Sequence, residues 1–537
     1  MAGSTAQADN NEASFILLVT IFEITSMQPI RDFLWQVMEF SALVLATGIL
    51  FGFIAVVMIF FIDINQKEQA IRRNYPVIGR LRYLFEHLGV FFRQYFFAMD
   101  REELPFNRAQ RAWVARAAKD VDPTIAFGST KPINEPGQIL FLNSMFPKLD
   151  NDAEQEERRP IVFGQGYAQQ PYSTFSVFHI SAMSYGAVSA PAIEALSRGA
   201  ATAGILLNTG EGALVSHHSA GECDLVFQIG TAKYGVRDLH GNLSDDKLRE
   251  VAANEQVKMF EIKLSQGAKP GKGGILPGEK VTEIIATTRG IPVGKDSISP
   301  NRHTDIDSTA ALLTMIHRVR SVTGRPTGIK FVLGQALWLD EFCAEIHRMG
   351  LNYAPDFVTI DSADGGTGAA PQSLMDNVGL PLSSSLPLVV DKLNQYGLRQ
   401  RIRVIASGKL ITPSGVAAAL CLGADCVNTA RGFMFALGCI QALQCNQNTC
   451  PTGITTHDKD LQKGLDPRNK AIRVANYANN LMKEVTTLAH SCGVFNPHEL
   501  GREHAYMINS HGLPQRLLDV YPEVATDPQY QDLAASA

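Results

Sequence analysis

The chain has 537 residues, of which 45% are hydrophobic and 19% charged, with 44 Gly, 26 Pro and 8 Cys, an ordinary globular composition. This composition excludes a disordered, a collagen-like and a small disulfide-stapled protein. Lys and Arg number 48 and Asp and Glu 53, so no excess of positive charge indicates nucleic-acid binding.

One uncharged apolar segment, residues 41–62, stands out near the start of the chain. At about 1.5 Å per residue it can cross a hydrocarbon core of ~30 Å. A buried core helix or a cleaved signal peptide is the alternative, but the run is long for a signal core and starts late. Five basic residues follow the segment closely, and Arg31 alone precedes it, so we expect a single membrane span with the large C-terminal part in the cytoplasm.

Residues 1–63 are therefore interpreted as an N-terminal segment with one transmembrane helix. Residues 64–165 combine apolar positions at helical spacing with charges, which predicts a juxtamembrane helical subdomain. Residues 461–537 contain further helical pieces and are interpreted as a C-terminal helical extension.

Between these parts lie eight short apolar runs. Continuous rather than alternating runs are typical of strands buried on both faces of a parallel sheet, and helical stretches such as 308–322 separate several of them. We predict an α/β fold, a (β/α)₈ TIM barrel over residues 166–460, with a doubly wound open sheet as the alternative. The runs are 175–181, 204–209, 225–230, 259–265, 328–334, 357–363, 402–407 and 426–430.

Glycine-rich sequences follow most of these runs. The C-terminal ends of the strands carry the chemistry of such barrels, and glycines let backbone approach a ligand closely. Together they favour a phosphate-bearing cofactor over plain turns. The residues expected to contact it are Ser181, Ala182, Met183, Ser184, Asn208, Asp364, Gly365, Gly366, Ser407, Gly408, Thr429, Ala430 and Arg431.

Four lysines and one glutamate are further candidates. Lys263 and Lys330 lie inside apolar strands, where a cation is costly unless it meets an anion, such as the anionic edge of a flavin, or forms an inward salt bridge. Glu211, in NTGEG, is a candidate for substrate contact or proton transfer. Lys269 and Lys272, on a glycine-rich loop, could hold a dicarboxylate; Lys272 could equally be solvated.

Three cysteines, Cys439, Cys445 and Cys450, form a C-x₅-C-x₄-C pattern after the last run. In a reducing cytosol this spacing suggests a metal or iron–sulfur site, either a three-iron cluster or zinc with one further ligand. Buried free thiols are the alternative. The remaining cysteines have no such spacing and are interpreted as core residues: Cys223, Cys343, Cys421, Cys426 and Cys492.

Several of these strings, in this order, resemble the FMN-binding synthase domain of glutamate synthase over roughly residues 170–460. The strings are SAMSYGAVS, NTGEG, KLSQGAKPGKGG, LPGEKVT, ISPNRHTDI, DGGTGAAP and GCIQALQCNQNTCPTGI. The whole chain resembles the membrane-anchored bacterial members, which implies a place in the inner membrane.

The resemblance implies FMN in the barrel and a 3Fe–4S cluster on Cys439, Cys445 and Cys450. It implies that reduced FMN gives a hydride to the imine formed from 2-oxoglutarate and ammonia, yielding L-glutamate. Glu211 and Lys269 would then be catalytic and, with Lys272, bind substrate. Electrons would come through the cluster from an external reductase or ferredoxin-like protein.

The chain also departs from the family pattern. It has no cysteine before Cys223, so it lacks the N-terminal glutaminase nucleophile, and a separate glutaminase subunit is a possible partner. Ile275 and Lys272 replace a Gln and a Glu of the family loop, and Ala213 and Leu214 alter the second strand's loop. Such changes can alter substrate choice. The alternatives are an N-methylglutamate synthase-like enzyme using another amine, and a membrane electron-transfer subunit.

Overall fold

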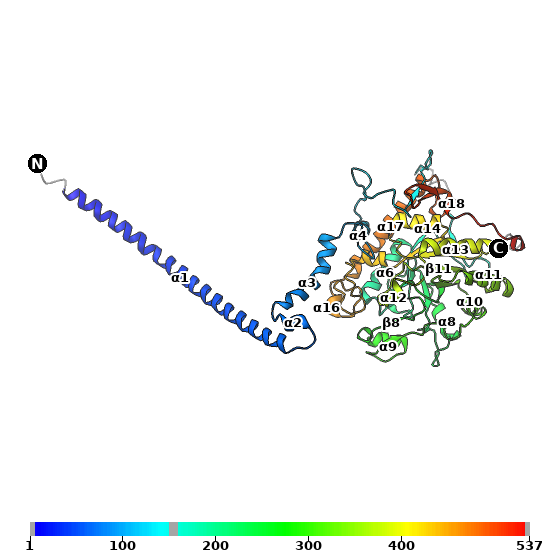
Figure 1. Ribbon diagram of the computed structural model, residues 1–537, viewed down its shortest axis with the longest axis horizontal. Coiled ribbons are helices and arrows are strands. Elements are labelled where there is room, and N and C mark those ends of the chain that lie inside the picture. Colours follow the sequence, from blue (N-terminus) through cyan, green and yellow to red (C-terminus); the bar gives the residue numbers. More distant parts are fainter. Residues whose placement is uncertain (1–5, 150–158, 532–537) are drawn as a thin grey trace. The chain divides into compact units, whose positions relative to one another are not determined.

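The computed structural model describes residues 6–149 and 159–531 and divides the chain into two compact units, Met1–Glu103 and Leu104–Ala537. The first unit is helical (Figure 1). Its elements are α1 (Ala6–Asn65), α2 (Ala70–Asn74), α3 (Gly79–Phe92) and the π-helix η1 (Arg93–Phe97). Within the described residues, one helical stretch, Arg31–Asn65 of α1, is long and apolar enough to cross a membrane, and it includes the segment predicted to do so.

The second unit is built around a closed barrel of eight parallel strands. Each of the eight predicted apolar runs overlaps one barrel strand, so the predicted (β/α)₈ architecture is confirmed and the open sheet is not formed. In barrel order the strands are β4 (Phe178–Ile180), β5 (Leu207–Asn208), β6 (Leu225–Ile229), β7 (Val257–Lys263), β10 (Thr327–Phe331), β11 (Phe357–Asp361), β12 (Arg403–Ser407) and β13 (Cys426–Thr429), which pairs with β4.

Helices connect successive strands and surround the barrel. They are α6 (Ala190–Ala203), α8 (Asp245–Ala252), α10 (Thr309–Thr323), α11 (Leu337–Met349), α13 (Leu382–Gln395) and α14 (Pro413–Cys421), and α15 (Arg431–Leu437) follows the last strand. Between β7 and α10 lies an excursion, residues 264–308, with a small hairpin of β8 (Ile275–Leu276) and β9 (Ser297–Ile298), the turn η2 (Gly278–Lys280) and α9 (Glu283–Arg289).

Helix α10 illustrates how the sequence specifies these elements. The Ser308 side chain accepts a hydrogen bond from the amide of Ala311 and caps the helix start, and Gly324, at a φ of 70°, ends it in the left-handed conformation. Its buried apolar positions recur every three or four residues, namely Leu312, Leu313, Ile316 and Val319. Each such burial contributes roughly 2 kcal/mol.

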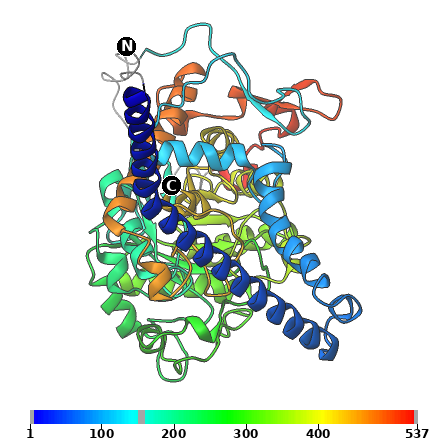
Figure 2. The same ribbon diagram turned by 90° about the vertical axis from the view of Figure 1, so that its left-hand side faces the viewer.

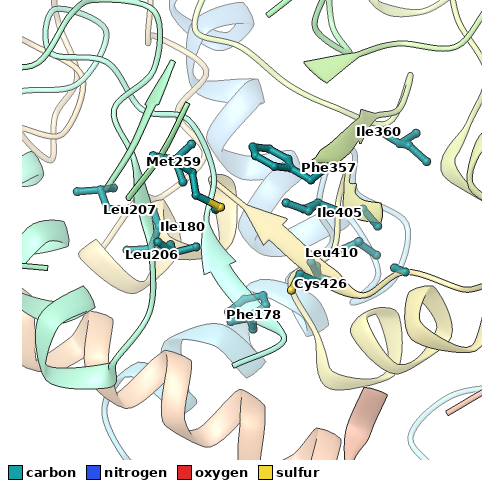
Figure 3. Packing of buried hydrophobic residues seen from close by; sticks show 14 of the residues in the cluster. Phe178, Ile180, Leu206, Leu207, Met259, Phe357, Ile360, Ile405, Leu410 and Cys426 are labelled. Carbon is teal, nitrogen blue, oxygen red and sulfur yellow. The ribbon is translucent and has the colours of Figure 1, made fainter. Parts of the chain in front are cut away.

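The apolar core lies between the barrel strands and the helices (Figure 3). On β4, Phe178 stacks against Phe433 of α15 at 5.4 Å between ring centroids and meets Tyr477 edge-on at 5.7 Å. Because side chains alternate along a strand, His179 faces the opposite way, into the barrel. The strands therefore direct apolar groups outward to the helices and polar groups inward.

The C-terminal extension packs on this unit. Helix α17 (Pro467–Ser491) lies against α6 and against α4 (Arg108–Ala118). Beyond it, β14 (Ala505–Ile508) joins β1 (Ile139–Phe141) and β15 (Pro514–Arg516) in a three-stranded antiparallel sheet (Figure 2). The extension therefore contributes strands as well as helices. Shorter elements are β2 (Ile161–Phe163), β3 (Tyr172–Thr174), α7 (Ser216–Ser219), α12 (Gln372–Met375), α16 (Lys459–Gln462) and α18 (Leu517–Val520).

Candidate active site

A cavity of about 710 Å³ lies at the C-terminal ends of the barrel strands. Most residues singled out from the sequence line it: Ser181, Ala182, Met183, Ser184, Glu211, Lys263, Lys269, Lys330, Asp364, Gly365, Gly366, Ser407, Gly408, Thr429, Ala430, Arg431, Cys439, Cys445 and Cys450. Two do not. Asn208 is buried below the cavity floor, and Lys272 is exposed on its loop.

An ion pair forms the centre of the cavity. Lys263 Nζ at the end of β7 donates to Glu211 Oε1 at 2.6 Å and to Gln266 Oε1 at 2.5 Å. Burial opposes ionisation of Glu211, but Lys263, Lys269 and Lys330 outweigh it and lower its pKa. Burial also lowers the pKa of Lys263, against the attraction of Glu211. The inward salt bridge considered from the sequence is thus present, and it faces the cavity.

Lys269 brings a second cation to this end. Its side chain is 3% exposed, and burial, together with repulsion from Lys263, lowers its pKa to about 8. Within the described chain, no oxygen accepts a hydrogen bond from its Nζ. A buried ammonium without an acceptor is suited to bind an anionic ligand. Lys330 is farther from its own counter-ion, with Nζ 3.8 Å from Asp361 Oδ2.

A buried carboxylate organises the floor. Glu261 accepts from Asn208 Nδ2 at 2.9 Å, from Gln228 Nε2 at 2.6 Å and from Thr359 Oγ1 at 2.7 Å. The side-chain amide nitrogens of Asn208 and Gln228 therefore both point towards Glu261, below the cavity floor. Asn208 Oδ1 then accepts from the amide of Gly210 at 3.0 Å, which fixes the loop that carries Glu211. Glu261 therefore supports the cavity through residues that it orients.

The opposite end is a tight backbone cradle. Gly408 and Lys409, after β12, have φ angles of 139° and 51°. Successive amides in such turns form anion-binding concavities. A Cβ on Gly366 would lie 2.8 Å from the Arg431 guanidinium, so only glycine leaves that group room. Arg431 Nη2 donates to the Asp364 carbonyl at 2.5 Å.

The three patterned cysteines line the same cavity, and the eight cysteines of the chain are free thiols. Burial raises the pKa of Cys439 to about 12 and raises that of Cys445. The pKa of Cys450 is lowered, because hydrogen bonding, including contact with Thr452 Oγ1 at 3.4 Å, outweighs burial. In the described ranges, no three His, Cys, Asp or Glu side chains are grouped to hold a single metal ion.

A buried lysine, Lys280, joins the cysteine loop to the excursion after β7. Its Nζ donates to the carbonyls of Ala187 at 3.0 Å and Cys445 at 3.3 Å. Burial lowers its pKa to about 8, whereas the thiols of Cys445 and Cys450 act in the opposite direction.

The sequence did not predict several residues that line the cavity, namely Gln228, Gln266, Arg289 and Asn428. Arg289 ends α9, where its guanidinium donates to the Tyr185 carbonyl at 3.0 Å and to Ser297 Oγ at 3.2 Å. It follows no periodic apolar run, so only its spacing from the glycine-rich loop could have indicated it. Asn428 could have been found, since it immediately precedes the Thr-Ala-Arg-Gly string at the end of β13.

Comparison with known proteins identifies the family and several relatives of this chain. A family model described as the conserved region in glutamate synthase matches residues 138–495. The chain is 39% identical over 494 residues to the glutamate synthase large subunit-like protein YerD of Bacillus subtilis (strain 168), covering 84% of this chain and 93% of that protein. It is 34% identical over 414 residues to an archaeal-type glutamate synthase [NADPH] of Thermotoga neapolitana, covering 76% of each chain.

Two solved structures align with the chain at low sequence identity. A flavocytochrome b2 structure aligns with a TM-score of 0.43 and 14% identity, covering 79% of this chain and 87% of that one. A mandelate oxidase structure aligns with a TM-score of 0.42 and 15% identity, covering 74% and 98%.

Proposed function

The chain belongs to the glutamate synthase family, and from that membership we propose that it is an FMN-dependent oxidoreductase that reductively aminates 2-oxoglutarate to L-glutamate. The observation that carries the proposal is the buried cation Lys269 beside the Glu211–Lys263 pair in the barrel cavity. A dicarboxylate needs such a cation, and imine reduction needs a proton donor within reach.

The cavity residues fit FMN. The cradle at Gly408, Lys409 and Arg431 offers backbone amides and cations to a phosphate. Asn428 Oδ1, buried in the cavity wall, has no hydrogen-bond partner in the described chain and remains available to a ligand donor. Lys263 and Lys330 would face the flavin's anionic edge. FMN, when bound, supplies hydride transfer, and the protein supplies binding and orientation.

The cations that are not assigned to FMN define the substrate end of the cavity. Lys269 binds one carboxylate, and the buried guanidinium of Arg289 lies in the same cavity wall. Lys263 Nζ donates to Glu211 Oε1 across 2.6 Å, so the pair can hold a proton near the reacting nitrogen. Burial of this pair excludes water and strengthens both interactions.

The cysteine loop carries the ligand type of an iron–sulfur group. The thiols of Cys439, Cys445 and Cys450 line one cavity, and cysteine thiolates are the usual ligands of such clusters. We assign a 3Fe–4S cluster to them, through which an external reductase or ferredoxin-like protein supplies electrons. Ammonia comes from solution or from a separate glutaminase subunit.

One observation favours a second candidate. Ile275 lines the cavity where the family loop carries a Gln, so an apolar side chain faces the ligand there. This change supports an N-methylglutamate synthase-like reaction with another amine. The electron-transfer role has no such observation in its favour, because the ion pair and Lys269 are retained.

The membrane part of the proposal rests on α1. The apolar stretch of Arg31–Asn65 crosses the bacterial inner membrane once, and the basic residues that follow keep the barrel in the cytoplasm.

A single-turnover experiment tests the reaction. The protein, shown to contain FMN and iron, is reduced anaerobically with dithionite, freed of excess reductant and mixed with 2-oxoglutarate and ammonium. We expect flavin reoxidation with stoichiometric L-glutamate. Flavin that stays reduced would exclude this half-reaction, and reoxidation with methylamine in place of ammonium would favour the second candidate.

Two lysines of one loop sharpen the test. Replacing buried Lys269 by Met should lower kcat/KM for 2-oxoglutarate by about 100-fold, since a desolvated carboxylate loses its charged partner. Lys272→Met, at an exposed position, should cost far less. Equal losses would show that the carboxylate lies elsewhere.

A further inference from the structure

Helix α3 and the π-helix η1 form a second membrane-facing element: we propose that residues 79–97 lie along the lipid–water interface, with one apolar face in the acyl boundary. This inference rests on the proposed membrane span of α1. It adds a contact with lipid that the span does not require.

The segment carries a continuous apolar stripe. Its members lie at i, i+3, i+4, i+7, i+11, i+14 and i+15, which places them on one face of a helix. They are Leu81, Leu84, Phe85, Leu88, Phe92, Tyr95 and Phe96. The rings of Phe92 and Phe96 contact each other along it at 5.6 Å between centroids. Arg82, Glu86 and Arg93 lie outside the stripe.

This stripe is not covered by the unit that carries it. Tyr95 is 51% exposed, Phe85 63% and Phe96 75%. So many neighbouring aromatic and leucine side chains in water would be an aggregation surface. Phenylalanine and leucine on one face with arginine on the other are the composition of helices that lie in a membrane interface.

The turn after the spanning helix is rigid. Asp63, near the end of α1, has a fully buried side chain that accepts hydrogen bonds from Arg72, Arg80 and the amide of Val77. The Arg80 contact is bidentate, with Nε 2.9 Å from Oδ2 and Nη2 2.8 Å from Oδ1. Because Arg80 lies in the first turn of α3, this cluster joins the base of α1 to the start of the stripe. The stripe thus begins close to the base of the spanning helix.

Charge identifies anionic lipid as the surface contacted. Residues 66–97 contain six basic and two acidic side chains, whereas the whole chain has a net charge of −5. Four of these basic side chains lie outside the Asp63 cluster and are exposed to an anionic leaflet, namely Lys67, Arg73, Arg82 and Arg93. Long arginine side chains can reach the headgroups while their stems stay against the apolar layer. A bilayer matches both faces of the segment.

Photocrosslinking in the full-length holoenzyme tests the proposal. The protein is reconstituted in vesicles of phosphatidylcholine with about one third phosphatidylglycerol, doped with a phospholipid that carries a diazirine in its acyl chain. Adducts are mapped by mass spectrometry. We expect adducts on residues 81–97 in addition to α1.

A pair of variants on α3 controls the measurement. Phe85→Asp puts a carboxylate in the stripe and should reduce adducts on 81–97 by about fivefold. His87→Asp introduces the same group at an exposed position outside the stripe and should leave them within about twofold. FMN content of each variant shows that the barrel is folded.

Extraction with alkaline carbonate separates the two proposals. Release of the protein from vesicles would overturn the span itself. Retention with adducts confined to α1 would overturn only the interfacial segment.

Discussion

Buried charge at single residues decides what the cavity can do. Lys263 and Glu211 satisfy each other, whereas Lys269 has no acceptor among the described residues and Glu261 has three neutral donors. A buried carboxylate is tolerated when its oxygens accept several hydrogen bonds. These hydrogen bonds offset the free-energy cost of burying Glu261, and they also fix the side chains of Asn208 and Gln228.

Glu261→Gln tests this residue. An amide presents one acceptor where the carboxylate presents two, and its NH₂ would meet donors. We expect a loss of about 3 kcal/mol in the free energy of unfolding and weaker FMN binding, because Gln228 is released. Urea denaturation and flavin fluorescence measure both.

Thr359→Val is the graded control for that variant. It removes one donor, leaves the carboxylate two, and should cost only about 1 kcal/mol. An unchanged urea midpoint in Glu261→Gln would contradict the role of Glu261 in organising the cavity floor.

Elements differ in how far the sequence predicts them. Barrel strands were predictable because each is a continuous apolar run, and the glycine-rich strings at their ends located the cavity. The excursion of residues 264–308 was not, since β8 and β9 have two residues each and follow no periodic pattern. Tertiary packing of this excursion places Arg289 and Ile275 in the cavity wall. Asn208 was expected to contact the cofactor, but it is buried below the cavity floor, where its amide is bonded to Glu261.

Lys280 connects this excursion to the cysteine loop, and its replacement by Met tests the coupling of the two elements. Loss of a buried positive charge beside Cys445 should lower the reduction potential of the iron–sulfur cluster proposed for the cysteines by tens of millivolts. A potentiometric titration followed by electron paramagnetic resonance, with iron content determined in parallel, measures the shift. Lys295→Met, at an exposed position in the same excursion, should leave the potential unchanged. Equal reduction potentials in the two variants would show that Lys280 has only a structural role.

At the scale of the whole molecule, the polar interior links the fold to pH. Four histidines are held neutral by burial: the pKa is lowered to about 3 for His179 and to about 4 for His218, His303 and His457. Each makes a hydrogen bond with a backbone group, such as that between His303 Nε2 and the Lys263 carbonyl at 2.9 Å. Two of the four, His218 and His303, bond to carbonyls of residues that line the cavity, so acid should loosen the barrel and its site together.

This arrangement predicts acid sensitivity over a defined range. The unfolded chain binds protons at these histidines near pH 6.5 and the folded chain only near pH 4, so stability is fully present above pH 6.5 and falls as pH drops towards 4. Each histidine can remove up to about 3 kcal/mol across that range. The urea midpoint of the detergent-solubilised chain should therefore fall steeply between pH 6.5 and 4. His303→Gln should flatten the slope and exposed His511→Gln should not, whereas a midpoint independent of pH would mean that these imidazoles bind protons equally well in the folded and the unfolded chain.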